Sequence, residues 1–477
     1  MAALWTTDDM AAAMRAEKSV TLPAEVSGIS IDSRSAARGE AFFAIQGDAR
    51  DGHDFVEAAL KSGAGLAVVA RDRRTRFAAD APLLLVDDVL EALRDLGRAG
   101  RARFKGQVIA VTGSVGKTST KDALRLALTA DGETHASAAS YNNHWGVPLS
   151  LARCPASAKY AVFEIGMNHA GEITPLTQMA RPHVAIVTTV EPVHLEYLGS
   201  IEKIADAKAE IFLGLVEDGA AVINRDNGQY ERLTAAAEAA QVSRIVTFGA
   251  NPQAEARLVR HALQPDSSTV EAVIFGTPIA YKLGAPGRHI VMNSLAVLAA
   301  VSLVGADLAV AALALGRLKS AVGRGARIPL GLPNGEALLI DESYNANPAS
   351  MRAAIALLGQ AETGPMGRRI AVIGDMLELG DLGPRLHAEL AEAIVANNID
   401  LVYCAGPLSR ALWEALPPNR RGGYAETAAV LEPAVIGAIR AGDAVMVKAS
   451  NGSKMGPLVK ALERQFPRRG ALAPAEG

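Results

Sequence analysis

Residues 108–120 read VIAVTGSVGKTST, and this stretch decides the fold of the middle of the chain. A run of small and β-branched apolar residues leads into Gly113 and Gly116, and Lys117 and Thr118 open the helix that follows. Such glycines allow a tight turn whose N–H groups point at phosphate oxygens, and the helix N-terminus adds positive potential. The strict phosphate-loop pattern has a further glycine five residues before Gly116, which this chain lacks, so we interpret the stretch as a shortened variant.

The residue types of this loop predict the parts of a nucleotide site. We expect Lys117 to reach the β- and γ-phosphates and the Thr118 hydroxyl to take a magnesium coordination position. A glycine-rich turn before a purely structural helix is the alternative, but a turn alone does not require lysine and threonine at the helix start. Because a phosphate loop indicates a nucleotide and not a reaction, other residues have to supply the chemistry.

Further β-branched runs alternate with helical patterns along the middle of the chain. They lie at 160–165, 183–190, 220–223 and 244–248. Continuous apolar strands separated by helices indicate a parallel sheet covered on both faces. We therefore predict an α/β protein whose central domain is a doubly wound, mostly parallel sheet. Two strand-like stretches within 256–284, each interrupted by polar residues, predict a small antiparallel addition to this domain.

The same alternation restarts on either side of this central domain. Runs at 370–373, 400–404 and 444–448 predict a smaller Rossmann-like α/β sheet near the C-terminus. The N-terminal part predicts a small α/β unit of its own. At roughly 150 residues per domain, a chain of 477 residues has room for three domains. We place these domains at 1–105, 106–318 and 319–477.

The composition is that of an ordinary globular protein. Apolar residues make up 49% and charged residues 21%, which argues against a disordered or fibrous chain. The formal net charge of −3 gives no electrostatic reason to expect a nucleic-acid partner. With only Cys154 and Cys404 there is no disulfide framework, so we expect a cytoplasmic protein. Gly305 and Asp307 interrupt the apolar stretch 295–316, which predicts two short buried helices and no membrane insertion.

Three side chains near later strands extend the candidate site. Glu164 ends the next strand, where α/β sheets present catalytic groups, and we predict a magnesium ligand there rather than a solvated acid. His194 follows the third strand and is either a second metal ligand or an ordinary loop residue. Lys208 lies on the apolar stripe of a helix predicted over 201–213, where burial lowers the pKa of an amine. A neutral amine beside a metal forms a carbamate with carbon dioxide, but from the sequence alone we favour a side chain that snorkels to solvent.

Together these motifs resemble those of the Mur ligases, and the resemblance covers nearly the whole chain. The matching segments are TGSVGKTS, NNHWGVP at 142–148, EIGMNHAGEI and DESYNANPASM at 341–351. The loop variant alone is shared by a wider group that includes folylpolyglutamate synthases. SYNANP together with GDMLELG at 374–380 is similar to the branch of the family that adds D-alanyl-D-alanine.

The resemblance implies a set of ligand contacts, residue by residue. The residues that it implies for ATP are Gly113, Ser114, Val115, Gly116, Lys117, Thr118, Ser119, Asn293, Arg324 and Asp341. Those that it implies for the UDP-sugar peptide or the dipeptide are Ser33, Arg34, Gly47, His53, Asn142, Asn143, Tyr344, Asn345 and Asn347. Without the family, Ser33 and Arg34 are equally consistent with a turn that carries a surface cation.

The resemblance also implies the metals and the catalytic groups. Thr118 and Glu164 would hold one Mg²⁺, and His194 with a carbamylated Lys208 would help to place a second, which reverses our interpretation of Lys208 from the sequence alone. Lys117, His194 and Lys208 are the implied catalytic residues. Two departures from the family pattern concern the C-terminal domain: Glu342 stands where an aspartate is common, and VKASNGSKMG at 447–456 replaces a Gly/Ser/Arg-type motif.

The activity implied by the resemblance is ATP-dependent ligation of D-alanyl-D-alanine to UDP-N-acetylmuramoyl-tripeptide through an acyl phosphate, by a cytoplasmic monomer. Two alternatives stay open at this point. Another family member, such as the diaminopimelate-adding ligase, is one, although its Asp-Asn-Pro-Arg motif is absent here. A phosphate-loop ATPase without ligase chemistry is the other, and its ATP hydrolysis would not depend on an amino substrate.

Overall fold

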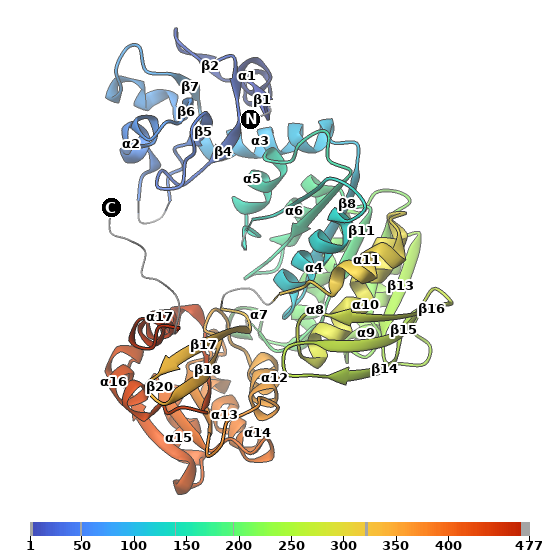
Figure 1. Ribbon diagram of the computed structural model, residues 1–477. Helices are drawn as coiled ribbons and strands as arrows, with labels where there is room; N and C mark the ends of the chain where they lie inside the picture. Colours follow the sequence, from blue (N-terminus) through green and yellow to red (C-terminus); the bar gives the residue numbers. More distant parts are fainter. Residues whose placement is uncertain (1–2, 48–49, 139, 194, 320–322, 469–477) are drawn as a thin grey trace.

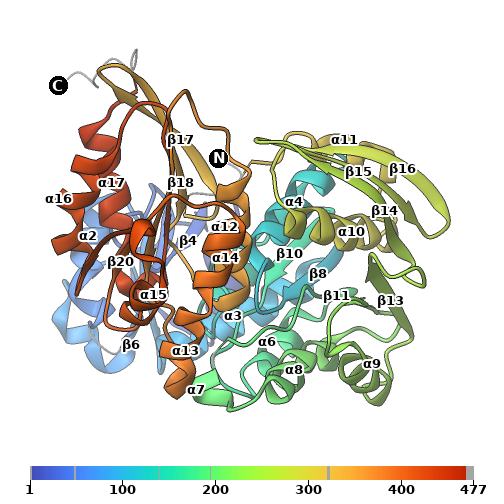
Figure 2. The same cartoon turned by 90° about the horizontal axis from the view of Figure 1, so that it is seen from below.

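The computed structural model describes residues 3–47, 50–138, 140–193, 195–319 and 323–468. In these ranges the chain forms three α/β units, each built on a mainly parallel sheet, which confirms the predicted fold class. Figure 1 and Figure 2 both place the central unit to one side of the N-terminal and C-terminal units. None of the helices in the described ranges has the length and apolar character that a membrane span requires.

Among the described residues the central sheet has nine strands, in the order β16-β15-β14-β13-β12-β11-β8-β10-β9. The part predicted as parallel consists of β8 Gln107–Thr112, β9 Thr134–Ala136, β10 Tyr160–Glu164, β11 Val184–Val187, β12 Ala220–Asn224 and β13 Arg244–Gly249. The antiparallel addition has three strands where the sequence indicated two, β14 Ala256–Leu263, β15 Ser268–Ile274 and β16 Thr277–Leu283. Since β8 lies between β11 and β10, the phosphate loop after it shares the carboxyl edge with the ends of those two strands.

Helices cover both faces of the central sheet, as its apolar strands require. One face packs against α4 Lys117–Thr129, α10 Arg288–Leu303 and α11 Leu308–Leu315. The other face packs against α5 Gly146–Ala152, α6 Ile173–Ala180, α8 Ile201–Ala209 and α9 Tyr230–Ala239. The short helix α7 Leu195–Leu198 precedes α8, and the 3₁₀ turn η3 Glu210–Gly214 follows it.

The apolar stretch after residue 295 forms two helices, as predicted. Gly305 has a φ of +72° after the end of α10, and the side chain of Asp307 accepts a hydrogen bond from the Val310 N–H at the start of α11. The prediction that both helices are buried is wrong for α11. Its Leu313 side chain is 82% exposed, because α11 covers the edge of the sheet and keeps one face in solvent.

The N-terminal domain has a five-stranded sheet in the described ranges, in the order β2-β7-β6-β5-β4. Its strands are β2 Glu17–Lys18, β4 Gly28–Ser30, β5 Glu40–Phe43, β6 Leu66–Ala70 and β7 Leu83–Val86. A separate pair is formed by β1 Trp5–Thr6 and β3 Glu25–Val26. The helices are α1 Thr7–Met14, α2 Val56–Lys61 and α3 Val89–Arg103, with the 3₁₀ turns η1 Gly52–Phe55 and η2 Arg71–Arg76.

The helix α3 joins this domain to the central one by packing against α5 at backbone distance. A Cβ added at Gly97 would lie 2.9 Å from the Pro148 carbonyl oxygen, and one at Gly100 would lie 2.5 Å from that of Leu151. The Trp5 indole N–H donates a hydrogen bond of 2.8 Å to the Ala152 carbonyl oxygen beside this contact. Because two glycines remove the side chains in between, the N-terminal and central domains form an intimate interface.

The C-terminal domain has a six-stranded sheet in the part of the chain that the structure describes, in the order β17-β18-β22-β19-β20-β21. Its strands are β17 Ala326–Leu332, β18 Gly335–Glu342, β19 Arg369–Gly374, β20 Leu401–Ala405, β21 Arg421–Ala425 and β22 Ala444–Lys448. Its main helices are α12 Pro348–Gly359, α13 Gly383–Ala388, α14 Leu390–Ala396, α15 Arg410–Ala415, α16 Ala428–Ala438 and α17 Gly456–Gln465. All pairs except β17–β18 are parallel, so the carboxyl ends of five strands meet at one edge.

Candidate active site

The phosphate loop follows β8 and requires glycine at two positions. Gly113 has a φ of +142° and Gly116 a φ of +88°, conformations that side chains rarely adopt. A Cβ at Gly113 would lie 1.9 Å from Thr188 Oγ1, and one at Gly116 would lie 2.3 Å from Asn293 Nδ2. Asn293 on α10, implied for the nucleotide by the resemblance, therefore lies directly against the loop.

The start of α4 presents a lysine and an uncapped helix end to the loop. Gly116 is the N-cap of α4 and provides no side-chain cap, so the helix N-terminus is open to an anionic group. The Lys117 Nζ donates a hydrogen bond of 2.6 Å to the Gly113 carbonyl oxygen, which holds the amine over the loop. Burial lowers the pKa of Lys117, the Glu164 carboxylate opposes this shift, and the Arg324 charge adds to it.

Three other loop residues use their polar groups to fix the loop shape. Ser114 Oγ donates to the Glu191 carbonyl oxygen at 3.0 Å and accepts from the Glu191 N–H at 2.9 Å. The Val115 carbonyl oxygen accepts a bond of 2.6 Å from Thr188 Oγ1, and Ser119 Oγ donates to the Gly116 carbonyl oxygen at 3.0 Å. Together with the hydrogen bond of 2.8 Å from the Ser114 N–H to the Thr189 carbonyl oxygen, these contacts anchor the loop to the segment after β11.

Glu164, at the end of β10, lies beneath the helix start in a small oxygen-rich cluster. Its carboxylate is 1% exposed and accepts hydrogen bonds from Thr118 Oγ1 at 2.9 Å and from Asn142 Nδ2 at 2.7 Å. Within the described ranges no group of three or more His, Cys, Asp or Glu side chains could hold a metal ion by itself. One carboxylate and one hydroxyl fit Mg²⁺, which usually completes its shell with substrate phosphates and water.

The two asparagines of the 142–148 segment have different surroundings. Asn142 contacts Glu164, whereas the Asn143 side-chain oxygen accepts from the Gly146 N–H at 3.0 Å at the start of α5. The structure thus brings Asn142 to the predicted metal ligand and uses Asn143 at a helix end.

Lys208 is buried within α8, so the interpretation of a snorkelling side chain is wrong. Only 2% of the residue is exposed, and its amine has no hydrogen-bond or ion-pair partner among the described residues. Burial and, second, the charge of Lys117 hold the pKa of Lys208 well below its usual value. An amine in this state is nucleophilic. His194, its predicted companion, lies outside the described residues.

A residue of the C-terminal segment reaches the nucleotide side of the central domain. Arg324 Nη2 donates a hydrogen bond of 3.2 Å to Ser140 Oγ, and its guanidinium lies 4.5 Å from the centroid of the Tyr344 ring. Arg324 and Tyr344, which the resemblance assigns to different ligands, are therefore neighbours. A second link between the domains is the hydrogen bond of 3.3 Å from the Glu196 N–H to the Glu378 carbonyl oxygen.

Comparisons with known families and proteins show which family the chain belongs to. Family models match at residues 25–101 (Mur ligase family, catalytic domain), 111–301 (Mur ligase middle domain) and 330–451 (Mur ligase, glutamate ligase domain). The UDP-N-acetylmuramoyl-tripeptide–D-alanyl-D-alanine ligase of Bacillus subtilis is 35% identical, and the match covers 92% of this chain and 93% of that protein. The Escherichia coli ligase of the same name is 34% identical, with 91% and 93% covered. The chain belongs to the Mur ligase family.

Solved structures of relatives share the whole architecture of this Mur ligase. MurF from Acinetobacter baumannii aligns with a TM-score of 0.82 at 29% identity, covering 96% of this chain and 99% of that one. MurF from Thermotoga maritima, solved in complex with ADP, aligns with a TM-score of 0.74 at 26% identity, covering 92% and 97%. These alignments confirm the three-domain arrangement expected from the resemblance.

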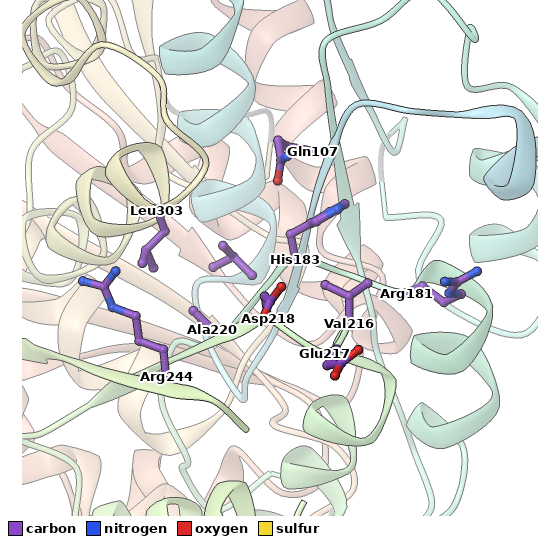
Figure 3. A pocket seen from close by; sticks show the side chains of 10 residues that line it. Gln107, Arg181, His183, Val216, Glu217, Asp218, Ala220, Arg244 and Leu303 are labelled. Atoms are coloured by element: carbon purple, nitrogen blue, oxygen red, sulfur yellow. The ribbon is translucent and has the colours of Figure 1, made fainter. Parts of the chain in front are cut away.

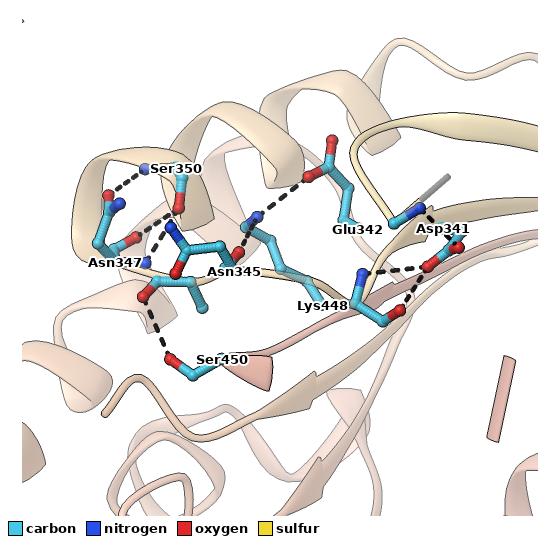
Figure 4. Close-up of polar contacts among 10 residues, drawn as sticks. Asp341, Glu342, Asn345, Asn347, Ser350, Lys448 and Ser450 are labelled. Atoms are coloured by element: carbon cyan, nitrogen blue, oxygen red, sulfur yellow. Dashed lines mark hydrogen bonds and ion pairs between the residues drawn. The ribbon is translucent and has the colours of Figure 1, made fainter. Parts of the chain in front are cut away.

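The polar residues of the 341–347 segment in this Mur ligase mainly hold one another. Asp341 is 2% exposed and accepts from the Gly323 N–H at 2.9 Å and from Ser343 Oγ at 2.6 Å. Asn347 forms a capping box with Ser350 at the start of α12, although its buried Nδ2 has no partner in the described structure (Figure 4). Tyr344 and Asn345 are exposed and available to a ligand.

The residues implied for the UDP-sugar have internal partners in the N-terminal domain. Arg34 pairs with Asp32 through hydrogen bonds of 2.9 and 2.7 Å, next to the half-buried Ser33. His53 is buried; its Nδ1 donates to Asp51 at 2.6 Å and its Nε2 accepts from the Ala70 N–H at 2.9 Å. Both ring nitrogens of His53 therefore have partners within the domain. The Gly47 N–H donates to the Arg50 carbonyl oxygen at 2.9 Å.

Sequence reasoning missed a cavity of about 460 Å³ at the carboxyl edge of the C-terminal sheet. Its walls include Asp375 and Glu426, directly after β19 and β21, and Lys454, which follows the 3₁₀ turn η6 Asn451–Ser453 after β22. The motif GDMLELG contains Asp375, so one signal for this cavity was present in the sequence. These three charged side chains stand among apolar ones, which include Leu377, Pro407 and Leu458.

A second cavity, of about 560 Å³, lies at the opposite edge of the central sheet (Figure 3). It is lined at the amino ends of β8, β11, β12 and β13 by residues that include Gln107, Arg181, His183, Asp218 and Arg244. Because the phosphate loop leaves the carboxyl end of β8, this cavity is not part of the nucleotide site.

Proposed function

We propose that this Mur ligase joins D-alanyl-D-alanine to UDP-N-acetylmuramoyl-tripeptide and converts ATP to ADP and phosphate. The observation that carries the proposal is that Arg324, stacked on Tyr344 of the SYNANP motif, hydrogen-bonds to Ser140 of the central domain and lies within electrostatic range of Lys117 in the phosphate loop. A ligase needs this juxtaposition because the phosphoryl group and the amino substrate have to meet. The curated names of the B. subtilis and E. coli relatives support the choice of substrates.

In this proposal the reaction has two steps. The terminal carboxylate of the tripeptide attacks the γ-phosphate of ATP, which gives an acyl phosphate and releases ADP. The dipeptide amine then attacks the acyl carbon, a tetrahedral intermediate forms, and phosphate leaves with the carbonyl restored. Phosphoryl transfer depends on positioning and on stabilisation of charge. The loop N–H groups and Lys117 would position the transferred phosphoryl group and stabilise its charge.

The oxygen cluster beneath the loop supports a magnesium site. Thr118 and Glu164 would hold one Mg²⁺, with Asn142 orienting the carboxylate. When bound, the ion neutralises charge on the β- and γ-phosphates. We also propose that Lys208 reacts with carbon dioxide, losing one proton, to give a carbamate anion that helps His194 to hold a second ion. The burial that lowers the pKa of Lys208 supports this modification, because a carbamate forms only from an unprotonated amine.

We assign one substrate to each domain. Residues 1–105 would bind the UDP-sugar, 106–318 bind ATP, and 319–477 close over ATP with the dipeptide. Closure would exclude water from the acyl phosphate, which otherwise hydrolyses. Because one chain supplies all three parts, the proposal needs only a monomer. The two buried free cysteines are consistent with a reducing cytoplasm.

One assay tests the proposed function. Phosphate release from ATP should require both UDP-N-acetylmuramoyl-tripeptide and D-alanyl-D-alanine, because the acyl phosphate is discharged only by the dipeptide amine. Release is measured with each substrate omitted in turn, and the pentapeptide product is identified by its mass. ATP hydrolysis at the same rate with and without the dipeptide would indicate a phosphate-loop ATPase instead. Activity only with diaminopimelate and a UDP-dipeptide would indicate a different family member.

The cavity at the carboxyl edge of the C-terminal sheet is our candidate site for the dipeptide. A dipeptide is zwitterionic, and the lining of the cavity contains both the Lys454 side chain and those of Asp375 and Glu426. Lys454 precedes the N-terminus of α17, where the helix dipole also favours a carboxylate. This arrangement would hold the dipeptide carboxylate near Lys454 and its amine near the acids.

Lys454→Met should raise the KM for D-alanyl-D-alanine about tenfold, since one charge-assisted contact is lost, with little change in the KM for ATP. The test compares the dipeptide with D-alanyl-D-alanine amide, which has no terminal carboxylate. If Lys454 binds that group, the substitution should have no further effect on the KM for the amide. Lys460→Met is the matched control, because Lys460 is exposed on α17 and does not line the cavity. An equal effect on both substrates would exclude this placement.

A further inference from the structure

Two neighbouring strands of the C-terminal sheet end in a buried ion pair. Glu342 and Lys448 lie opposite each other in the register of β18 and β22, and the Lys448 Nζ lies 3.1 Å from Glu342 Oε2. Lys448 is 1% exposed, so its ammonium depends on the partners that the protein provides. Glu342, which stands where the family pattern has an aspartate, is the partner of this lysine.

The lysine also holds the loop that follows β18. Its Nζ donates a second hydrogen bond, of 2.9 Å, to the Asn345 carbonyl oxygen (Figure 4). Ser450, two residues further along the chain, contacts the Ala346 carbonyl oxygen through its Oγ at 3.4 Å. Two side chains at and just after the end of β22 therefore contact successive carbonyl groups of residues 343–347, those of Asn345 and Ala346.

The opposite side of the same loop carries the contact to the nucleotide site. The Tyr344 N–H donates to the Gly323 carbonyl oxygen at 3.2 Å, and the Tyr344 ring lies against Arg324, which reaches Ser140. Glu342 and Lys448 also lie within electrostatic range of His289, in the first turn of α10 of the central domain. A displacement of the loop would therefore move Tyr344 and release Arg324.

We propose that Lys448, paired with Glu342, is a positioning residue for ATP: it holds the 343–347 loop so that Tyr344 keeps Arg324 against the nucleotide site. This inference deepens the proposed function and rests on it for the identity of the nucleotide. Lys448 does not touch the substrate in this proposal. Its action passes through the loop backbone, then through the Tyr344 ring to the Arg324 guanidinium.

The test is the affinity for ATP, measured by equilibrium titration and as the KM in the ligase assay. Lys448→Met should weaken ATP binding about tenfold, because the loop loses its support and the Glu342 charge loses its partner. Glu342→Gln keeps an acceptor for Lys448 and should weaken ATP binding about threefold, and it remains informative if Lys448→Met does not fold. Measuring binding directly separates failure of this inference from failure of the ligase assignment.

A double-mutant cycle with Arg324 distinguishes positioning from a general loss of stability. Because Lys448 acts through Arg324, Lys448→Met should change ATP affinity little in an Arg324→Met background. Arg368→Met is the matched control: it breaks the ion pair of the half-buried Arg368 with the buried Asp443 (2.7 Å), which lies at the amino ends of β19 and β22 at the other edge of the same sheet. This control should lower the melting temperature and leave ATP affinity unchanged. Additive effects of Lys448→Met and Arg324→Met, or unchanged ATP affinity in both Lys448→Met and Glu342→Gln, would overturn the proposal.

Discussion

Substitution of Lys117 by alanine should lower kcat for dipeptide-dependent phosphate release by about 10³-fold, or about 4 kcal/mol of transition-state stabilisation. The lysine lies over the phosphate loop, with its Nζ 2.6 Å from the Gly113 carbonyl oxygen, where the β- and γ-phosphates are expected. Charge on the transferred phosphoryl group would then lose its nearest cation. The measurement is steady-state phosphate release at saturating substrates.

The melting temperature of this variant should stay close to that of the parent protein, since Lys117 is only half-buried and makes one backbone hydrogen bond. Lys117→Arg should also be strongly impaired, because the broad guanidinium does not replace a compact ammonium inside a tight loop. Lys105→Ala is the matched control, an exposed lysine at the junction before the central domain, and should keep full activity. Substantial turnover by Lys117→Ala would refute the proposal that Lys117 binds the β- and γ-phosphates.

Lys208→Ala should lower kcat by about 10²-fold or more, and millimolar acetate or formate should restore part of the activity. A short carboxylate would occupy the space of the missing carbamate and supply its metal-binding oxygens. The parent enzyme should also lose activity in buffers stripped of carbon dioxide and regain it with bicarbonate. Both effects are measured by the same phosphate-release assay.

Lys203→Ala is the control for the helix, because Lys203 is exposed on α8 five residues before Lys208. It should have no effect and no rescue. Lys208→Met, which fills the buried space without an amine, separates loss of the carbamate from loss of packing and should respond to carboxylates less than the alanine variant. Full activity of Lys208→Ala without added carboxylate would exclude a catalytic carbamate.

Much of the fold follows from local patterns in the sequence. The central strands β8, β10, β11, β12 and β13 are continuous apolar runs, so their type and parallel pairing were predictable. The outer strands β17 and β21 of the C-terminal sheet were not predicted. One contains Pro329 and Gly331 and the other reads RGGYA, and both lie at sheet edges, where pairing with a neighbour outweighs local propensity.

The candidate site also has one part that was predictable from local sequence and one part that was not. Gly113, Gly116, Lys117 and Thr118 are close in sequence, and the short loop between a strand and a helix leaves them little choice of arrangement. The hydrogen bonding of His53 depends on the Ala70 N–H, and the burial of Lys208 depends on the core around α8. Contacts of this kind are not visible in local sequence, because the partners are distant along the chain.

By itself, the sequence determined the three α/β domains, the phosphate loop and the family, because each depends on residue types at short, fixed spacings. Only the tertiary structure decided which side chains are buried and which distant segments meet. It buried Lys208, paired Lys448 with Glu342 across adjacent strands, and set Arg324 between Tyr344 and Ser140. The physical reason is that burial and charge pairing depend on which strand ends share one sheet edge, and this follows from strand order, not from spacing along the chain.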